Sequence, residues 1–75
     1  MNRERRVKLR EAQDKLSEVR DKIESIREEE DEARENMPEN LQSSENYDAS
    51  EECSRAMDEA VSLIDSAICS IEEAT

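Results

Sequence analysis

Apolar or small side chains recur at alternating steps of three and four residues through the first half of this 75-residue chain. One core position of this heptad repeat holds Leu9, Leu16, Ile23, Glu30 and Met37. The other core position holds Ala12, Val19, Ile26 and Ala33. Such a repeat predicts a helix that packs lengthwise against another helix. We expect this first helix to cover about residues 3–36.

A proline follows the repeat and predicts its end. Pro38 lacks the amide that a continuing helix needs and disfavours helical geometry in the residue before it. Residues 37–44 are therefore expected to form a turn, and a second helix is expected over about residues 45–74. Its start is signalled either by Ser44 or by Asp48, which has the spacing of a capping box with Glu51. The sequence predicts a single all-α domain, residues 1–75, folded as an antiparallel, coiled-coil-like helical hairpin.

The apolar residues of the second helix cover a wider arc than those of the first. At 100° per residue they span roughly 160°, more than one antiparallel neighbour can bury. A second chain is the simplest cover for the remainder, so we expect a homodimer that forms a four-helix bundle. The candidate oligomer contacts are Ala56, Met57, Val61, Leu63, Ile64, Ile68 and Ile71.

The net charge of −11 is unevenly distributed along the chain. Residues 1–27 hold nine basic and six acidic side chains, whereas residues 28–75 hold two basic and sixteen acidic ones. An acidic body repels nucleic acid and anionic membranes, which disfavours both as direct partners. In a hairpin, the basic segment 3–10 is expected to lie near Glu72 and Glu73.

An acidic run, residues 28–32, lies within the expected first helix. A calcium site needs ligands that converge from a bent loop, and the chain has no glycine for such a turn, so we expect a solvated acidic segment. Within it, Glu30 occupies a core heptad position. Either the seam is open there, or Glu30 selects register or oligomeric state and pairs with Arg34 or Arg55.

The side chains argue against catalysis. The chain has no histidine, no glycine-rich phosphate loop and no nucleophile with a base placed to activate it, so we expect neither an enzyme nor a cofactor or metal site. Cys53 lies at the centre of the apolar arc and is expected to be a small core residue, whereas Cys69 falls outside the arc. Without an apolar run long enough for a signal peptide or a membrane span, we expect a cytoplasmic protein with reduced thiols.

The segments ENMPENLQSSENYDASEE and MDEAVSLIDSAICSIEEA resemble short acidic helical-hairpin proteins encoded by phages, prophages and gut bacteria. The resemblance covers nearly the whole chain and rests most on the turn at Met37 and Pro38. The Glu-Glu-Ala-Ile/Val repeat of those proteins is interrupted here by Ser62, Ser66, Cys69 and Ser70. The resemblance implies a helical hairpin but carries no activity.

Two functions follow as hypotheses. In the first, the chain is a non-enzymatic homodimeric interaction module whose charged outer surface or bundle ends engage another protein. The candidate partner contacts are Met37, Leu41, Tyr47, Glu28, Glu29, Asp31 and Glu32. In the alternative, the chain is an acidic decoy that presents carboxylates in place of phosphates and blocks a basic nucleic-acid-binding groove on a host protein.

Overall fold

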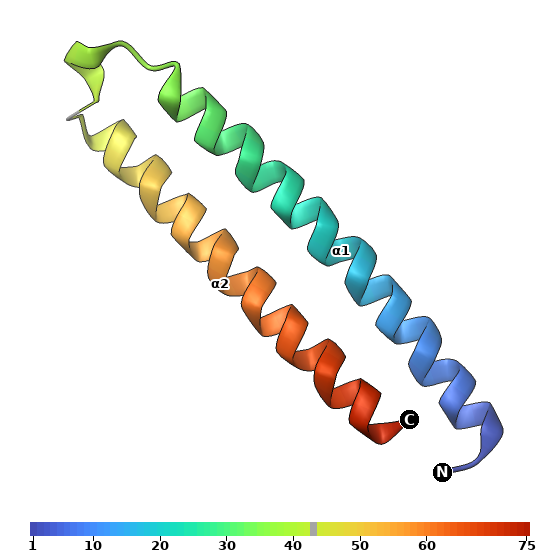
Figure 1. The fold of residues 1–75 in the computed structure, drawn as a ribbon. Coiled ribbons are helices and arrows are strands. Elements are labelled where there is room, and N and C mark those ends of the chain that lie inside the picture. The colour runs from blue at the N-terminus through green and yellow to red at the C-terminus, as the bar shows by residue number, and fades with distance from the viewer. Residues whose placement is uncertain (43) are drawn as a thin grey trace.

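The computed structural model is a two-helix antiparallel hairpin, about 60 × 14 × 11 Å in extent (Figure 1). It describes residues 1–42 and 44–75. Helix α1 covers Arg3–Glu35, a short 3-10 helix η1 covers Glu39–Leu41, and helix α2 covers Glu45–Ala74. The predicted all-helical hairpin is confirmed, and α1 ends one residue earlier than expected.

Local side chains set both ends of α1. Asn2 caps the start, because its side-chain oxygen accepts a hydrogen bond of 2.9 Å from the backbone N–H of Arg5. At the other end Asn36 is the C-cap, and Pro38 takes an extended conformation with which the helix cannot continue. The turn therefore follows from the single proline in the chain.

Ser44 begins α2. Its hydroxyl accepts a hydrogen bond of 3.3 Å from the backbone N–H of Tyr47, which satisfies one of the unpaired donors of the first turn. Of the two predicted starts, Ser44 is the one used. Asp48 instead lies inside the first turn, where a carboxylate favours the helix N-terminus.

The seam of α2 has heptad spacing, and the seam of α1 differs from the prediction by one residue. On α2 the half-buried or buried seam residues are Tyr47, Ser50, Ser54, Met57, Val61, Ile64, Ile68 and Ile71. On α1 they are Leu9, Gln13, Leu16, Arg20, Ile23, Arg27, Glu30, Arg34 and Met37. The second predicted core position of α1 was wrong, because Val19 and Ile26 are 48% and 46% exposed. Polar residues occupy the seam in their place.

The core between the helices is thin. Within residues 1–42 and 44–75, only Val61 and Ser54 are buried, and the other seam residues remain partly exposed. A two-helix unit with so little buried apolar surface is expected to be marginally stable by itself. The geometry of the hairpin therefore depends mainly on the contacts along the seam.

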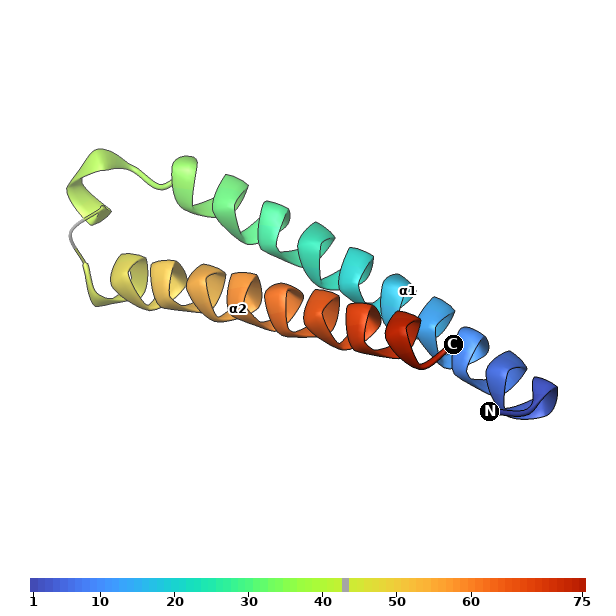
Figure 2. The ribbon, with the colours of Figure 1, turned by 60° about the horizontal axis from the view of Figure 1, so that its bottom comes forward.

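Helix α1 extends past the end of α2 (Figures 1 and 2). Gln13 lies level with Glu72, to which its amide donates a hydrogen bond of 2.7 Å, so residues 3–9 project beyond α2. The basic segment 3–10 was expected to lie near Glu72 and Glu73, but no ion pair joins it to α2 in the described part of the chain. The register fixed at Gln13 leaves most of this segment, here named the basic overhang, beyond the end of α2.

Candidate interaction surface

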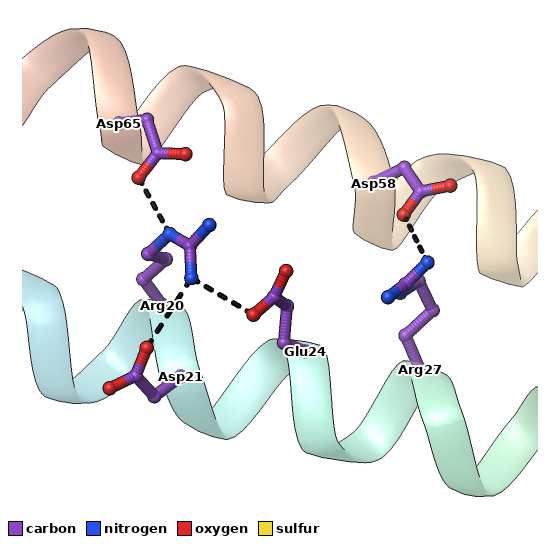
Figure 3. Close-up of polar contacts among 6 residues, drawn as sticks. All are labelled: Arg20, Asp21, Glu24, Arg27, Asp58 and Asp65. Carbon is purple, nitrogen blue, oxygen red and sulfur yellow. Dashed lines mark hydrogen bonds and ion pairs between the residues drawn. The ribbon is translucent and has the colours of Figure 1, made fainter.

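Four long polar side chains of α1 face α2 at intervals of seven residues: Gln13, Arg20, Arg27 and Arg34. We call these residues and their α2 partners the polar ladder. Arg20 Nε donates to Asp65 Oδ1 at 2.6 Å, and Arg27 Nη1 lies 3.1 Å from Asp58 Oδ1 (Figure 3). Residues seven apart are two helical turns apart and point in the same direction, so one side of the hairpin carries polar contacts along its length.

Arg20 makes the most ion pairs in the ladder. Its Nη1 atom contacts Glu24 at 2.9 Å on the next turn of α1 and Asp21 at 3.4 Å, while Nε holds Asp65 on α2 (Figure 3). The hydrogen bond with Asp65 and the surrounding carboxylates raise the pKa of the Arg20 guanidinium above its usual value. Arg20 thus stays charged and ties the two helices together near their middle.

Arg34 closes a smaller group near the turn. Its Nη2 lies 2.8 Å from Asp31 Oδ1, its Nη1 donates to Ser54 Oγ at 2.9 Å, and Ser54 donates in turn to Asp31 Oδ1 at 2.6 Å. Arg34 is therefore committed to Asp31 and not to Glu30. The predicted pairing of Glu30 with Arg34 or Arg55 was wrong, because the ion pairs of the described residues include none from Glu30.

The arginines of the ladder fill seam positions that a stable coiled coil would give to apolar residues. Their side chains are only 28%, 26% and 16% exposed at Arg20, Arg27 and Arg34, so their aliphatic stems cover the seam while their charged ends reach carboxylates or hydroxyls. The buried Nε of Arg27 has no acceptor among the described residues. Such contacts favour one register more than they add stability.

The opposite side of the hairpin is apolar. On α1 this side carries the residues that come just before the polar-ladder residues, and on α2 it carries residues that come just before seam residues such as Ser54 and Val61. Antiparallel packing brings these two rows to the same side. We name this surface the apolar face: Ala12, Val19, Ile26 and Ala33 on α1, with Cys53, Ala56, Ala60, Leu63 and Ala67 on α2. Ile26, Cys53 and Ala56 line one shared depression, which places both rows together.

The candidate oligomer contacts fall into two groups. Five lie in the seam between α1 and α2, where they pack within the chain: Met57, Val61, Ile64, Ile68 and Ile71. The expectation that Val61 meets a second chain was wrong, because α1 buries it. Ala56 is exposed and Leu63 is 64% exposed, both on the apolar face.

Both cysteines are exposed and free. Cys53 was expected in the core, but it precedes the buried Ser54 and so lies on the apolar face beside the seam. Cys69 is exposed, as expected for a residue outside the apolar arc.

The candidate partner contacts gather near the turn end of the hairpin. Leu41 is exposed in η1, whereas Met37 and Tyr47 are half-buried at the last level of the seam. The carboxylates of the acidic run that remain exposed are Glu28, Glu29 and Glu32. Asp31 is not free, since Arg34 and Ser54 hold it within the chain.

The described residues contain no group of histidine, cysteine and acidic side chains that could hold a metal ion. No helix in the described part of the chain is long and apolar enough to cross a bilayer.

Asp31 should link stability to pH. The hydrogen bond from Ser54, and then that from Arg34, lower the pKa of Asp31 below its usual 3.8. A carboxyl with a depressed pKa in the folded state stabilises the fold above its unfolded pKa and loses that contribution as pH falls through the folded pKa. In thermal melts, the advantage of the wild type over Asp31→Asn is expected to shrink between about pH 5 and pH 2. The exposed neighbour change Glu32→Gln serves as the control, and an advantage independent of pH would contradict the assignment.

Glu30 lies in the seam without an ion pair among the described residues, so it should cost stability. Replacing Glu30 by Leu is expected to raise the free energy of unfolding by about 1 kcal/mol, because a half-buried leucine replaces a half-buried carboxylate. Chemical denaturation measures the change, and the exposed control Glu32→Leu should give no comparable gain. A loss of stability would show that another group satisfies Glu30 in solution.

Neither a known protein family nor a curated protein matches the chain, and no solved structure matches it.

Proposed function

We propose that this protein is a non-enzymatic interaction module that pairs with a second copy to form a four-helix bundle and presents its charged outer surface to another protein. The observation that carries the proposal is the apolar face, on which Val19, Ile26 and Leu63 remain about half exposed or more. The other side of the same hairpin uses the polar ladder to satisfy its charges within the chain.

The contrast between the two sides supports self-association. Exposed aliphatic residues that line up along one whole side of a helical pair commonly mark an interaction surface, whereas scattered ones are ordinary. The thin seam adds a second reason, because a hairpin whose described residues include only one buried apolar side chain needs further cover to be stable. A second copy supplies the same apolar face in return, as an isologous dimer requires.

Dilution tests the proposal. For a folded dimer that dissociates on unfolding, the melting temperature rises with protein concentration, because association stabilises the folded state by mass action. Circular dichroism melts over a hundredfold concentration range are expected to show that rise. A helical chain whose melting temperature does not change with concentration would contradict self-association.

For the second protein that the bundle engages, we propose the turn end as the contact, through Met37, Leu41 and Tyr47. The exposed Leu41 supports this choice, since apolar and aromatic anchors dominate many interfaces. If so, retention of the partner from the native host should survive raised salt and fall with Leu41→Ala. The resemblance of the turn to phage and prophage hairpin proteins favours a bacterial or phage-infected cytoplasm as the setting, where both thiols stay reduced.

The alternative function, an acidic decoy for a basic nucleic-acid-binding groove, is favoured by the excess of sixteen acidic over two basic side chains in residues 28–75. Against it, Asp31, Asp58 and Asp65 are already paired with arginines of the same chain. A decoy should lose its partner as salt rises, and double-stranded DNA should compete for the same surface. Neutralising Glu28, Glu29 and Glu32 to Gln, with Asp31 to Asn, should then abolish binding, whereas the interaction module should keep it.

A further inference from the structure

We propose that the two copies pack apolar face to apolar face in a head-to-tail arrangement, with the two-fold axis perpendicular to the long axis at the level of Lys22 and Leu63. This inference rests on the proposed dimer and fixes its geometry. Each α1 then packs antiparallel on the α1 of the other copy, and each α2 on the other α2. The competing arrangement places α1 of one copy over α2 of the other, with the basic overhangs at the same end.

The polar ladder fixes which residues lie level within one chain. Gln13 contacts Glu72, Arg20 contacts Asp65 and Arg27 contacts Asp58, so each forward step of seven along α1 matches a backward step of seven along α2. Lys22, two residues past Arg20, is therefore level with Leu63, two residues before Asp65.

The length of the hairpin puts the two-fold axis at that level. The molecule runs from Arg3, at the overhanging end of α1, to Leu41 in η1 at the turn (Figure 2). Lys22 is the residue midway between them in sequence. Two copies turned about an axis at Lys22 and Leu63 overlap along their full length, and each basic overhang lies beside the turn of the other copy.

Apolar residues meet apolar residues across this axis. Val19 and Ile26 lie on either side of it on α1, so Val19 of each copy faces Ile26 of the other. On α2, Leu63 meets its own counterpart at the axis, and Ala60 faces Ala67. The face is thus complementary to itself about this level, as a two-fold interface requires.

Charge selects the head-to-tail arrangement. Residues 3–10 hold five basic and one acidic side chain. The axis at Lys22 sets them level with residues 34–41 of the other copy, which hold two acidic and one basic side chain, and near residues 45–51 at the start of its α2, which hold three acidic side chains and no basic one. Turning one copy end over end brings each basic overhang to the acidic, turn-proximal part of the other copy, and it sets Lys15 level with Glu29. The competing arrangement would gather both overhangs at one end, where like charges repel.

One pair of like charges remains in the proposed dimer. The two Lys22 side chains approach each other at the axis, where each has Glu18 of the other copy about one turn away. Long lysine side chains extend to the edge of an interface with their charged ends in water, so this pair costs little.

Single cysteines test the arrangement in a full-length background that carries Cys53→Ala and Cys69→Ser. A short bis-maleimide joins thiols that lie close together and tolerates more geometries than a disulfide does. Leu63→Cys alone and Lys22→Cys alone are each expected to give crosslinked dimer as the main product, because both positions lie at the axis. Ser62→Cys, which adjoins Leu63 but is off the apolar face, is the matched control and should give at least about tenfold less.

The outcomes separate the geometry from the dimer itself. If neither single variant crosslinks with itself but an equilibrated mixture of Leu63→Cys and Lys22→Cys does, α1 packs over α2, and the head-to-tail arrangement is overturned while the dimer stands. Crosslinking of Ser62→Cys as strongly as Leu63→Cys would also overturn it. If no variant crosslinks and light scattering gives the mass of one chain, both the geometry and the proposed dimer fail.

Discussion

The double change Ile26→Glu and Leu63→Glu is expected to convert the proposed dimer into a single chain at micromolar concentration. Ile26 and Leu63 are 46% and 64% exposed and lie outside the seam, so the change should leave the seam of the hairpin in place. In the dimer, however, each glutamate would enter an apolar interface near the two-fold axis. Burial of unpaired carboxylates costs several kcal/mol, which corresponds to a loss of affinity of about a hundredfold or more. Light scattering coupled to size exclusion reads the mass directly.

The control for this double change is Ser25→Glu and Ser62→Glu. It adds the same two charges to the same two helices at exposed positions off the apolar face. The control should keep the mass of the wild type and lose little stability. Equal dissociation of the two double variants would mean that net charge, and not the apolar face, governs association.

Val61→Asp is expected to unfold the chain at room temperature. Val61 is the one buried apolar residue in the described part of the structure and lies near the middle of α2. An aspartate there would place a carboxylate inside the seam, where Arg20 and Arg27 are already paired with Asp65 and Asp58, at a cost of about 3 kcal/mol or more. That exceeds what a thin two-helix core can lose, so the helical circular dichroism signal should collapse.

Val7→Asp is the control for Val61→Asp, because it makes the same substitution outside the seam. Val7 is half exposed on the basic overhang, beyond the end of α2, where no seam contact depends on it. Its melting temperature should stay close to that of the wild type, since an acidic residue near a helix N-terminus is tolerated or favourable. If Val61→Asp melted no earlier than Val7→Asp, the seam drawn through Val61 would be misplaced.

The hairpin itself could be predicted from local signals. Steps of three and four residues imply a long helix, Pro38 implies its end, and Ser44 satisfies the first turn of the next helix. Each of these signals lies within a few residues of the feature it controls. The second seam position of α1 could not be found in the same way, because it depends on residues of α2 far along the chain.

The polar ladder explains that error. Apolar periodicity favoured Val19 and Ile26 as core residues, but Arg20 and Arg27 occupy the seam because Asp65 and Asp58 stand opposite them. A signal was present in the sequence: three arginines at seven-residue spacing on one helix and acidic residues at the same spacing on the other. A hydrophobic pattern alone ignores this spacing, because the pattern treats arginine as a surface residue. The aliphatic stem of arginine nevertheless packs well in a seam.

The difference between the predicted and observed seams of α1 bears on the proposed function. The residues displaced from the core of the hairpin, with Val19 and Ile26 foremost, now form half of the apolar face. In the proposed dimer, this regular apolar repeat on α1 forms the interface between chains, while the polar repeat beside it sets the register within one chain.

Sedimentation equilibrium of the wild-type chain tests the central claim, that a second copy covers the apolar face, most directly. At micromolar concentrations and physiological salt, the fitted mass is expected to be twice the chain mass of 8.7 kDa and to fall toward one chain on dilution. A helical species that keeps the mass of a single chain across the whole concentration range would contradict the claim.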